Sequence, residues 1–213
     1  DLLVLCNVDR LNEAAAQVVR DRLQAGAGVW VMLGSHCDPE SWNLHLHQEG
    51  KGPLPVRLTG ARGYPLSGEE YYGFTVPAQT HPVFTDLAQD VYKDMFRLTP
   101  IYKFVASEAR DLPKEAEVLA RVTDPERSVL AVTNTYGAGK VLVFTSPVSL
   151  VPQRWNMLND LWFAFPLVRQ AAQWLCVPAV DPNNVAVGAP LSIALAERPA
   201  TVAIVLSERA DAQ

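Results

Sequence analysis

A group of chemically reactive side chains follows an apolar run near the start of the chain. Residues 28–33 form this run, and the residues after Gly34 are Ser35, His36, Cys37 and Asp38. An apolar run that ends in glycine and polar residues is typical of a buried strand, and ligands of open α/β sheets bind beyond the carboxyl ends of such strands. The hydroxyl, imidazole, thiol and carboxylate are therefore candidates for catalysis, metal binding or ligand binding.

Cysteine catalysis at Cys37 requires a general base within hydrogen-bond reach and a lowered thiol pKa. His36 is the immediate neighbour and cannot easily face the thiol on an extended backbone, so the base would be His45 or His81 folding back. Asp38 disfavours the thiolate, because a nearby negative charge raises a thiol pKa. We predict a partly buried structural thiol, with catalysis by Cys37 and His36, His45 or His81 as the alternative.

A metal site would have to use His36, Cys37, His45 and His47, the one cluster in the sequence with metal-ligand chemistry. If the segment before residue 47 is helical, the side chains of His45 and His47 point about 200° apart, which prevents both rings from binding one ion. The three cysteines are widely spaced and form no CxxC pair. We predict solvated surface histidines, and neither a metal nor another cofactor.

Binding of a small polar ligand is the remaining candidate chemistry. A short helix is predicted at residues 39–44, with Asp38 as its cap and Pro39 in its first turn, at the mouth of the crevice. Other aromatic side chains, including Tyr64, Tyr71, Tyr72 and Trp155, either line a binding face or pin irregular segments to the core. The predicted ligand-binding residues are Gly34, Ser35, His36, Asp38 and Trp42.

The first elements that position these residues read as strand, helix, strand. Residues 2–6 and 29–33 are continuous apolar runs, and a helix starts between them at Asn12 and Glu13. This order predicts two parallel strands joined by a crossover. Arg20, Asp21 and Arg22 are expected mostly on the outer face of the helix. The apolar positions at helical spacing are Ala15, Val18, Val19 and Leu23.

The rest of the chain is predicted to add an irregular insert, a meander and a long helix. Residues 50–77 are rich in Gly, Pro and Tyr, with candidate strands at 56–58 and 72–76; a short helix at 81–87 and an extended segment at 95–104 follow. Short turns make strands 116–122, 128–133 and 140–145 an antiparallel meander, and the Gly137–Lys140 segment is a hairpin turn within it. Residues 155–176 are a helix that Pro166 should kink or divide.

Composition limits the partners and the domain organisation. A net charge of −5 and a pI near 5.4 argue against nucleic-acid binding, which depends on a basic surface. We predict one α/β domain at residues 1–178, and a β-rich segment at 179–213 that starts a further domain. Because the chain opens directly on a strand, we expect it to be part of a longer protein.

Three segments resemble the glutamine-amidotransferase-like domains of large, membrane-anchored bacterial proteins, which often carry von Willebrand A modules and aerotolerance-type membrane segments. These segments are 1–8, 25–34 and 136–145, and His81–Phe84 and residues 184–188 also fit. The resemblance implies a flavodoxin-like three-layer sandwich with a mainly parallel sheet, an antiparallel meander and helices on both faces. It also implies that Gly34 lies at the glycine turn that contributes to the oxyanion hole of active relatives.

The sequence departs from the active members at the nucleophile. Active class I amidotransferases have a Gly-x-Cys-x-Gly elbow and a later His-x-Glu pair, and the chain has neither, since Cys37 lacks flanking glycines and no histidine follows His81. We therefore predict a non-catalytic scaffold, interaction or ligand-sensing domain of a membrane-associated protein at the cell envelope. Its partners would be other domains of that protein or proteins of a membrane complex. The alternatives are an amidotransferase or hydrolase that uses Cys37, and a carbohydrate-related binding domain similar to trehalose-utilisation-type proteins.

Overall fold

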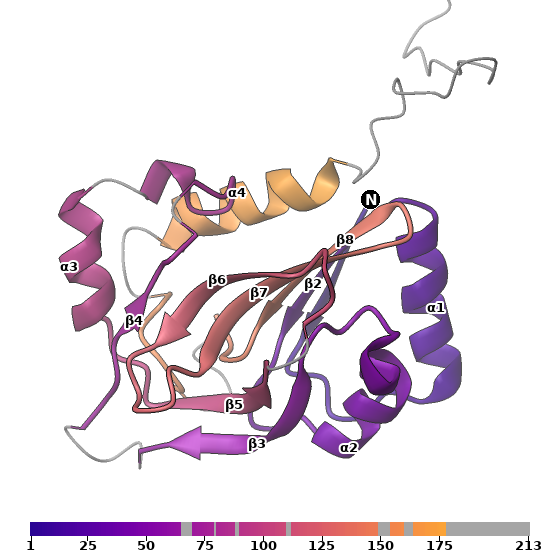
Figure 1. Ribbon diagram of the computed structural model, residues 1–213, viewed down its shortest axis with the longest axis horizontal. Coiled ribbons are helices and arrows are strands. Elements are labelled where there is room, and N and C mark those ends of the chain that lie inside the picture. The colour runs from indigo at the N-terminus through magenta and orange to yellow at the C-terminus, as the bar shows by residue number, and fades with distance from the viewer. Residues whose placement is uncertain are drawn as a thin grey trace, which may run out of the picture. The chain divides into compact units, whose positions relative to one another are not determined.

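A mixed six-stranded sheet in the order β1-β2-β8-β7-β6-β4 organises the domain (Figure 1). The structure is a computed structural model, and it describes residues 1–64, 70–78, 80–87, 90–109, 112–148, 154–159 and 164–177. The predicted domain boundary at 178 and the predicted β-rich segment 179–213 lie outside the described residues.

The sheet has a parallel part and an antiparallel part. Strands β1 (Leu2–Cys6), β2 (Gly28–Met32) and β8 (Gly139–Phe144) run parallel to one another. Strands β7 (Val129–Tyr136), β6 (Glu117–Val122) and β4 (Phe74–Thr75) continue the sheet in antiparallel pairs. The predicted α/β class, parallel unit and meander are confirmed. The sheet is mixed rather than mainly parallel, because short hairpin turns can join only antiparallel strands.

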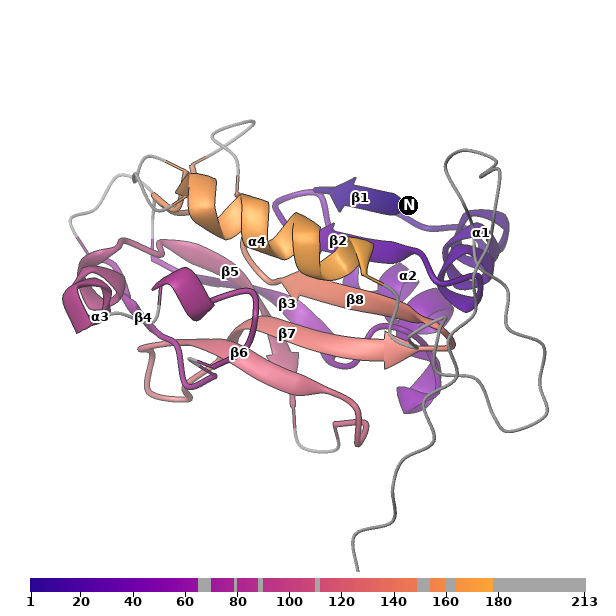
Figure 2. The same ribbon diagram turned by 90° about the horizontal axis from the view of Figure 1, so that it is seen from above.

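Helices cover both faces of the sheet and make the predicted three layers (Figures 1 and 2). One face packs against α1 (Glu13–Gln24), α2 (Pro39–Trp42) and η1 (Asn43–His47), and η2 (Gln48–Gly50) follows η1. The other face packs against η3 (Thr85–Leu87), α3 (Asp90–Leu98) and α4 (Ala164–Cys176). Alternate residues of β2 serve the two faces, since Val29 and Val31 join the α1 side and Trp30 joins the α4 side.

A second, two-stranded antiparallel sheet lies beside the end of β8. It consists of β3 (Arg57–Gly63) and β5 (Lys103–Glu108), so the candidate strand at 56–58 is longer than predicted. The Val105 N–H donates to the Thr145 carbonyl at 2.7 Å, which fixes β5 next to the residue that follows β8.

Helix α1 starts where the sequence predicts but buries a different stripe. The Asn12 side chain caps it by accepting from the Ala15 N–H at 2.8 Å. Val18 is 55% exposed and Ala15 is also exposed, whereas Arg20 is buried, so the predicted faces of these residues are wrong. The inward stripe is Ala16, Val19, Arg20 and Leu23.

The prediction of an extended segment at 95–104 is wrong. Residues up to Leu98 belong to helix α3, and the strand begins only at Lys103. The packing of Phe96 favours the helix. From α3, its buried ring packs against the rings of Phe74 and Phe84, at centroid distances of 4.9 and 6.5 Å. Pro100 follows the end of the helix, as expected for a residue that cannot continue one.

The predicted helix 155–176 is shorter than expected. Residues 154–159 are irregular, with the buried Asn156 donating to Ser146 Oγ and to the Pro147 carbonyl, both at 2.6 Å. Residues 160–163 lie outside the described part of the chain. The described helix starts at Ala164, so Pro166 stands in its first turn, where proline causes no kink. No helix among the described residues has both the length and the apolarity needed to cross a membrane.

Candidate functional site

The loops after β1 and β2 meet at the carboxyl edge of the parallel strands, where the sequence predicts the site. Asn7 has a left-handed backbone (φ 49°), and its N–H donates to the Met32 carbonyl at 2.8 Å. Its Oδ1 accepts from the His36 N–H at 2.9 Å. A Cβ on Gly34 would lie 2.5 Å from the same oxygen. Gly34 therefore leaves room for the Asn7 carboxamide to close over the loop.

Two further backbone N–H groups of this loop also pair within the protein. The Cys37 N–H donates to the Gly34 carbonyl at 3.2 Å, and the Asp38 N–H donates to the Asp9 carbonyl at 3.1 Å. Asp38 caps α2 by accepting from the Glu40 N–H at 3.2 Å and pairs with Arg10 Nε at 2.9 Å. The predicted cap is confirmed, and the Asp38 carboxylate is committed to structural contacts.

The Cys37 thiol is poorly placed for nucleophilic catalysis. It is half-buried and packs against the core on the α1 side of the sheet. Burial, followed by the negative charges of Asp38 and Asp9, raises the pKa of Cys37 to about 12. No hydrogen bond joins Cys37 to a histidine among the residues that the structure describes. This environment is that of a structural thiol, and it opposes thiolate formation.

The four histidines are not brought together. His36 is exposed, whereas His45 Nδ1 lies 3.0 Å from a Glu13 carboxylate oxygen and His47 Nδ1 lies 3.0 Å from the Leu54 carbonyl. His81 belongs to the segment that covers the opposite, α4 side of the sheet. Within the described ranges, no group of three or more potential metal ligands forms.

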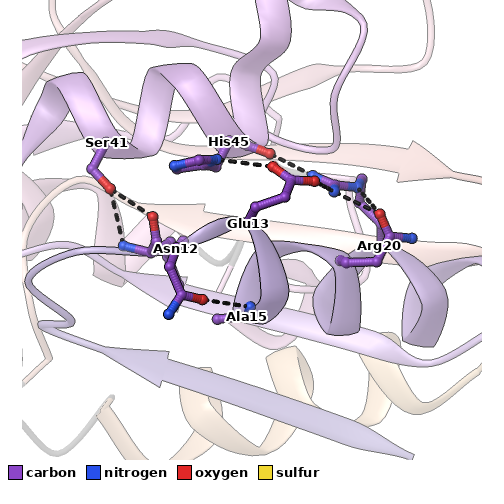
Figure 3. Close-up of polar contacts among 8 residues, drawn as sticks. Asn12, Glu13, Ala15, Arg20, Ser41 and His45 are labelled. Atoms are coloured by element: carbon purple, nitrogen blue, oxygen red, sulfur yellow. Dashed lines mark hydrogen bonds and ion pairs between the residues drawn. The ribbon is translucent and has the colours of Figure 1, made fainter.

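The contact of His45 belongs to a polar network that joins η1 to α1 (Figure 3). The Glu13 carboxylate pairs with both His45 and Arg20, and the Arg20 Nη1 donates to the His45 carbonyl at 2.7 Å. The same two partners, His45 first, lower the pKa of Glu13 by hydrogen bonding. Beside it, Ser41 Oγ donates to the Leu11 carbonyl at 2.8 Å. The network fixes the α2–η1 segment onto α1.

Trp42 does not line a ligand crevice, which corrects the sequence-based prediction. It is 1% exposed and lies in the core on the α1 side. Its indole Nε1 donates to the carbonyls of Val8 and Asp9 at 3.3 and 3.2 Å, and these hydrogen bonds fix the position of the loop after β1. Of the predicted ligand-binding residues only Ser35 and His36 are exposed, and Gly34 is buried.

His81 lies against Trp174 of α4, with ring centroids 4.9 Å apart. Its Nδ1 accepts from the Val83 N–H at 3.2 Å, and the Lys140 Nζ lies 5.0 Å from the centroid of the Trp174 ring. Burial, with a further contribution from the charge of Lys140, lowers the pKa of His81 to about 4. His81 is a neutral packing residue at neutral pH, remote from Cys37.

This pKa predicts a pH dependence of stability. The neutral ring stabilises the fold fully above the ordinary histidine value of 6.5, and this contribution is lost as the pH falls from 6.5 toward about 4. We expect the free energy of unfolding, measured by urea denaturation, to fall less steeply over that range in His81→Gln than in the parent. Equal slopes in His81→Gln and in the parent would contradict the assignment.

The sequence-based predictions missed a polar cavity at the end of the sheet where the carboxyl ends of the parallel strands lie. A volume of about 510 Å³ opens between β3, β5 and the β6–β7 turn, and Arg62, Arg121 and Arg127 line it. Tyr72, one of the aromatic residues considered for a binding face, lines an adjacent cavity that shares Arg62. The sequence signal for this cavity was that arginines stand near strand ends and in a turn. Such a placement forms no recognisable sequence motif.

Comparisons with known proteins define the fold. No protein-family model and no curated protein matches the chain. Among solved structures, a cytoplasmic protein of Salmonella typhimurium matches with a TM-score of 0.58 and 16% identity, over 82% of this chain and 71% of that one. A second cytoplasmic protein, from Salmonella typhimurium LT2, matches with a TM-score of 0.52 and 16% identity, over 83% and 70% of the two chains.

A third solved structure with the same arrangement is part of a much larger enzyme. The cold-adapted β-galactosidase of Rahnella sp. R3 matches with a TM-score of 0.53 and 13% identity, over 82% of this chain but 22% of the enzyme. At such identities the likeness concerns the fold and carries no activity. Together with the sheet order and the helices on both faces, these matches establish a flavodoxin-like α/β fold for the chain.

Proposed function

We propose that this amidotransferase-like domain is non-catalytic and acts by binding, as a scaffold, interaction or ligand-sensing domain. The observation that carries the proposal is the closed loop after β2. The N–H groups of His36 and Cys37 are engaged by Asn7 Oδ1 and by the Gly34 carbonyl. These two donors are thus paired within the protein and are not available to stabilise an oxyanion.

The chemistry of acyl transfer reinforces this proposal. Hydrolysis of glutamine through a thioester needs a thiolate, a base that accepts its proton and donors that stabilise the oxyanion. The Cys37 thiol has a pKa of about 12, and His45 and His47 bond to Glu13 and Leu54 instead. Neither the thiolate nor the base is supported by the geometry around Cys37.

The cellular context belongs to the same proposal. The resemblance to domains of membrane-anchored bacterial proteins supports a place in a larger, membrane-associated protein at the cell envelope. The binding partners would then be other domains of that protein or components of a membrane complex. The acidic net charge of −5 fits a protein or small-molecule partner better than a nucleic acid.

Alkylation of the three cysteines tests the proposal. At pH 7.5 we expect iodoacetamide to label Cys37 at least about tenfold more slowly than the exposed Cys6 and Cys176, because its thiolate is strongly disfavoured. Peptide mass spectrometry resolves the three sites, and the unfolded chain in urea serves as the control in which the rates converge. Glutamine hydrolysis should be undetectable and unchanged in Cys37→Ser. Fast labelling of Cys37 with a midpoint below about 8.5, or ammonia release lost in Cys37→Ser, would overturn the proposal.

A further inference from the structure

The polar cavity beyond β8 has the composition of an anion-binding site. It is about 510 Å³ in volume, and its walls come from β3, β5, the end of β6 and the β6–β7 turn. Two acidic residues, Glu108 and Glu126, and three arginines line it, so basic residues are in excess. The lining residues that carry the argument are Arg62, Arg121, Arg127, Ser128 and Glu126.

Within the described part of the chain, the contacts of Arg62 and Arg121 use few of their N–H donors. Arg121 Nη1 donates to the Arg127 carbonyl at 2.9 Å, and Arg62 Nη1 pairs with Glu126, while each guanidinium has five N–H donors. Among the described residues, the ion pairs include neither Arg121 nor Arg127. The planar fork of arginine matches the oxygen atoms of phosphate, so these groups suit that anion.

One further feature of the cavity wall is the backbone of Arg127. It is left-handed (φ 51°), which is uncommon for a residue other than glycine and tends to occur at functional sites. The turn that holds it is fixed from inside by Asp124, which accepts from the Ser128 N–H and Oγ, both at 2.7 Å.

The position in the fold agrees with a binding role. The start of β7 lies beside the end of β8, since Thr145 Oγ1 donates to the Val129 carbonyl at 2.7 Å. The cavity therefore opens at the same end of the sheet as the carboxyl ends of the parallel strands, where α/β folds bind ligands. It is displaced from the closed loop at Gly34 toward the antiparallel strands.

An aromatic wall continues the cavity on one side. An adjacent volume of about 440 Å³ shares Arg62 and Glu126 with it and is lined by Tyr72 and Phe104. The Tyr72 ring is supported by Tyr64, with centroids 4.7 Å apart. A ligand with a phosphate at the arginines would thus extend its organic part along Tyr72.

We propose that this arginine cavity binds a small organic phosphate, with the phosphate held by Arg121 and Arg127 and the organic part against Tyr72. The site is independent of Cys37 and of the closed loop, so it stands or fails separately from the absence of catalysis there.

Calorimetric titration of the whole chain at low ionic strength tests the proposal, with inorganic phosphate, glucose 6-phosphate and glucose as probes. We expect the phosphate ester to bind more tightly than inorganic phosphate, and glucose not to bind. Arg127→Gln and Arg121→Gln should each weaken binding of the ester about tenfold or more, because each removes charge-assisted hydrogen bonds. Arg22→Gln, which alters an exposed arginine of α1, is the matched control and should bind as the parent does.

Arg127→Gln carries the test if Arg121→Gln fails to fold, because the Arg127 side chain projects from an exposed turn. Three outcomes would overturn the proposal: no binding of either phosphate probe, equal affinity in Arg127→Gln and Arg22→Gln, or binding of glucose as tight as that of its phosphate.

Discussion

Replacement of Trp42 by alanine is expected to lower the free energy of unfolding by about 3–5 kcal/mol. The indole is 1% exposed, and it packs among the core residues between α1, η1 and the sheet. Its removal leaves a cavity and also leaves the carbonyls of Val8 and Asp9 without their donor. Urea denaturation followed by circular dichroism measures the loss.

The matched control for Trp42 lies two residues further along the chain. Leu44 is 69% exposed, so Leu44→Ala should change the free energy of unfolding by less than about 0.5 kcal/mol. Trp42→Phe retains most of the packing but loses the indole N–H, and we expect an intermediate value. If Trp42→Ala proved as stable as Leu44→Ala, Trp42 would be a surface residue free for ligands, contrary to the structure.

Gly28→Ala is expected to destabilise the fold by about 3 kcal/mol, at the upper end of overpacking effects. Gly28 opens β2 and lies under the last turn of α4, where an added Cβ would meet the Leu175 carbonyl oxygen at 2.4 Å and the Leu175 Cβ at 2.7 Å. Because the clash is with helix backbone, α4 must move away from the sheet. The thermal midpoint and the urea midpoint should both fall.

Gly50→Ala isolates the part of that effect that is due to contact. Gly50 has a φ of +85°, and a Cβ added there would have no neighbouring atom within 4 Å, so alanine adds only backbone strain of about 1–2 kcal/mol. A larger loss in Gly28→Ala than in Gly50→Ala supports the close approach of α4 to β2. Equal losses would mean that α4 does not rest on Gly28.

Local signals explain which elements could be predicted from the sequence. Asn12 followed by Glu13 is a helix start whose chemistry lies within four residues, and the structure confirms both the cap and the helix. The turn at Gly137 likewise requires only a residue that accepts a φ of +61° between two strands. Elements of this kind depend on neighbours in sequence, so periodicity and turn chemistry suffice.

Arg20 and Trp42 show where such reasoning stops. An arginine is buried only when distant groups satisfy it, and here the His45 carbonyl, 25 residues away, is one of them. The indole of Trp42 finds its acceptors in Val8 and Asp9, more than 30 residues earlier. Local periodicity does not include these distant partners. It therefore predicts an exposed Arg20 and a Trp42 that faces a ligand.

The arginine cavity was out of reach for the same reason. Arg62 comes from β3, whereas Arg121 lies near the end of β6 and Arg127 lies in the β6–β7 turn, about 60 residues later. Strand β3 reaches that turn only because β5 bonds to the residue after β8. No rule of sequence spacing connects residues that are brought together through two other strands. The loop around Cys37 could be predicted because its polar residues are consecutive in the sequence.

The position of β2 in the sheet has a consequence for how the chain folds during synthesis. One neighbour of β2, β1, precedes it closely, but the other, β8, is made more than a hundred residues later. At synthesis rates of about 5–20 residues per second, β2 presents an open backbone edge and the apolar Val29 and Val31 for roughly 5–20 seconds. An unpaired apolar strand edge is prone to aggregate, so nascent chains that stop before β8 should depend on chaperones to stay in solution.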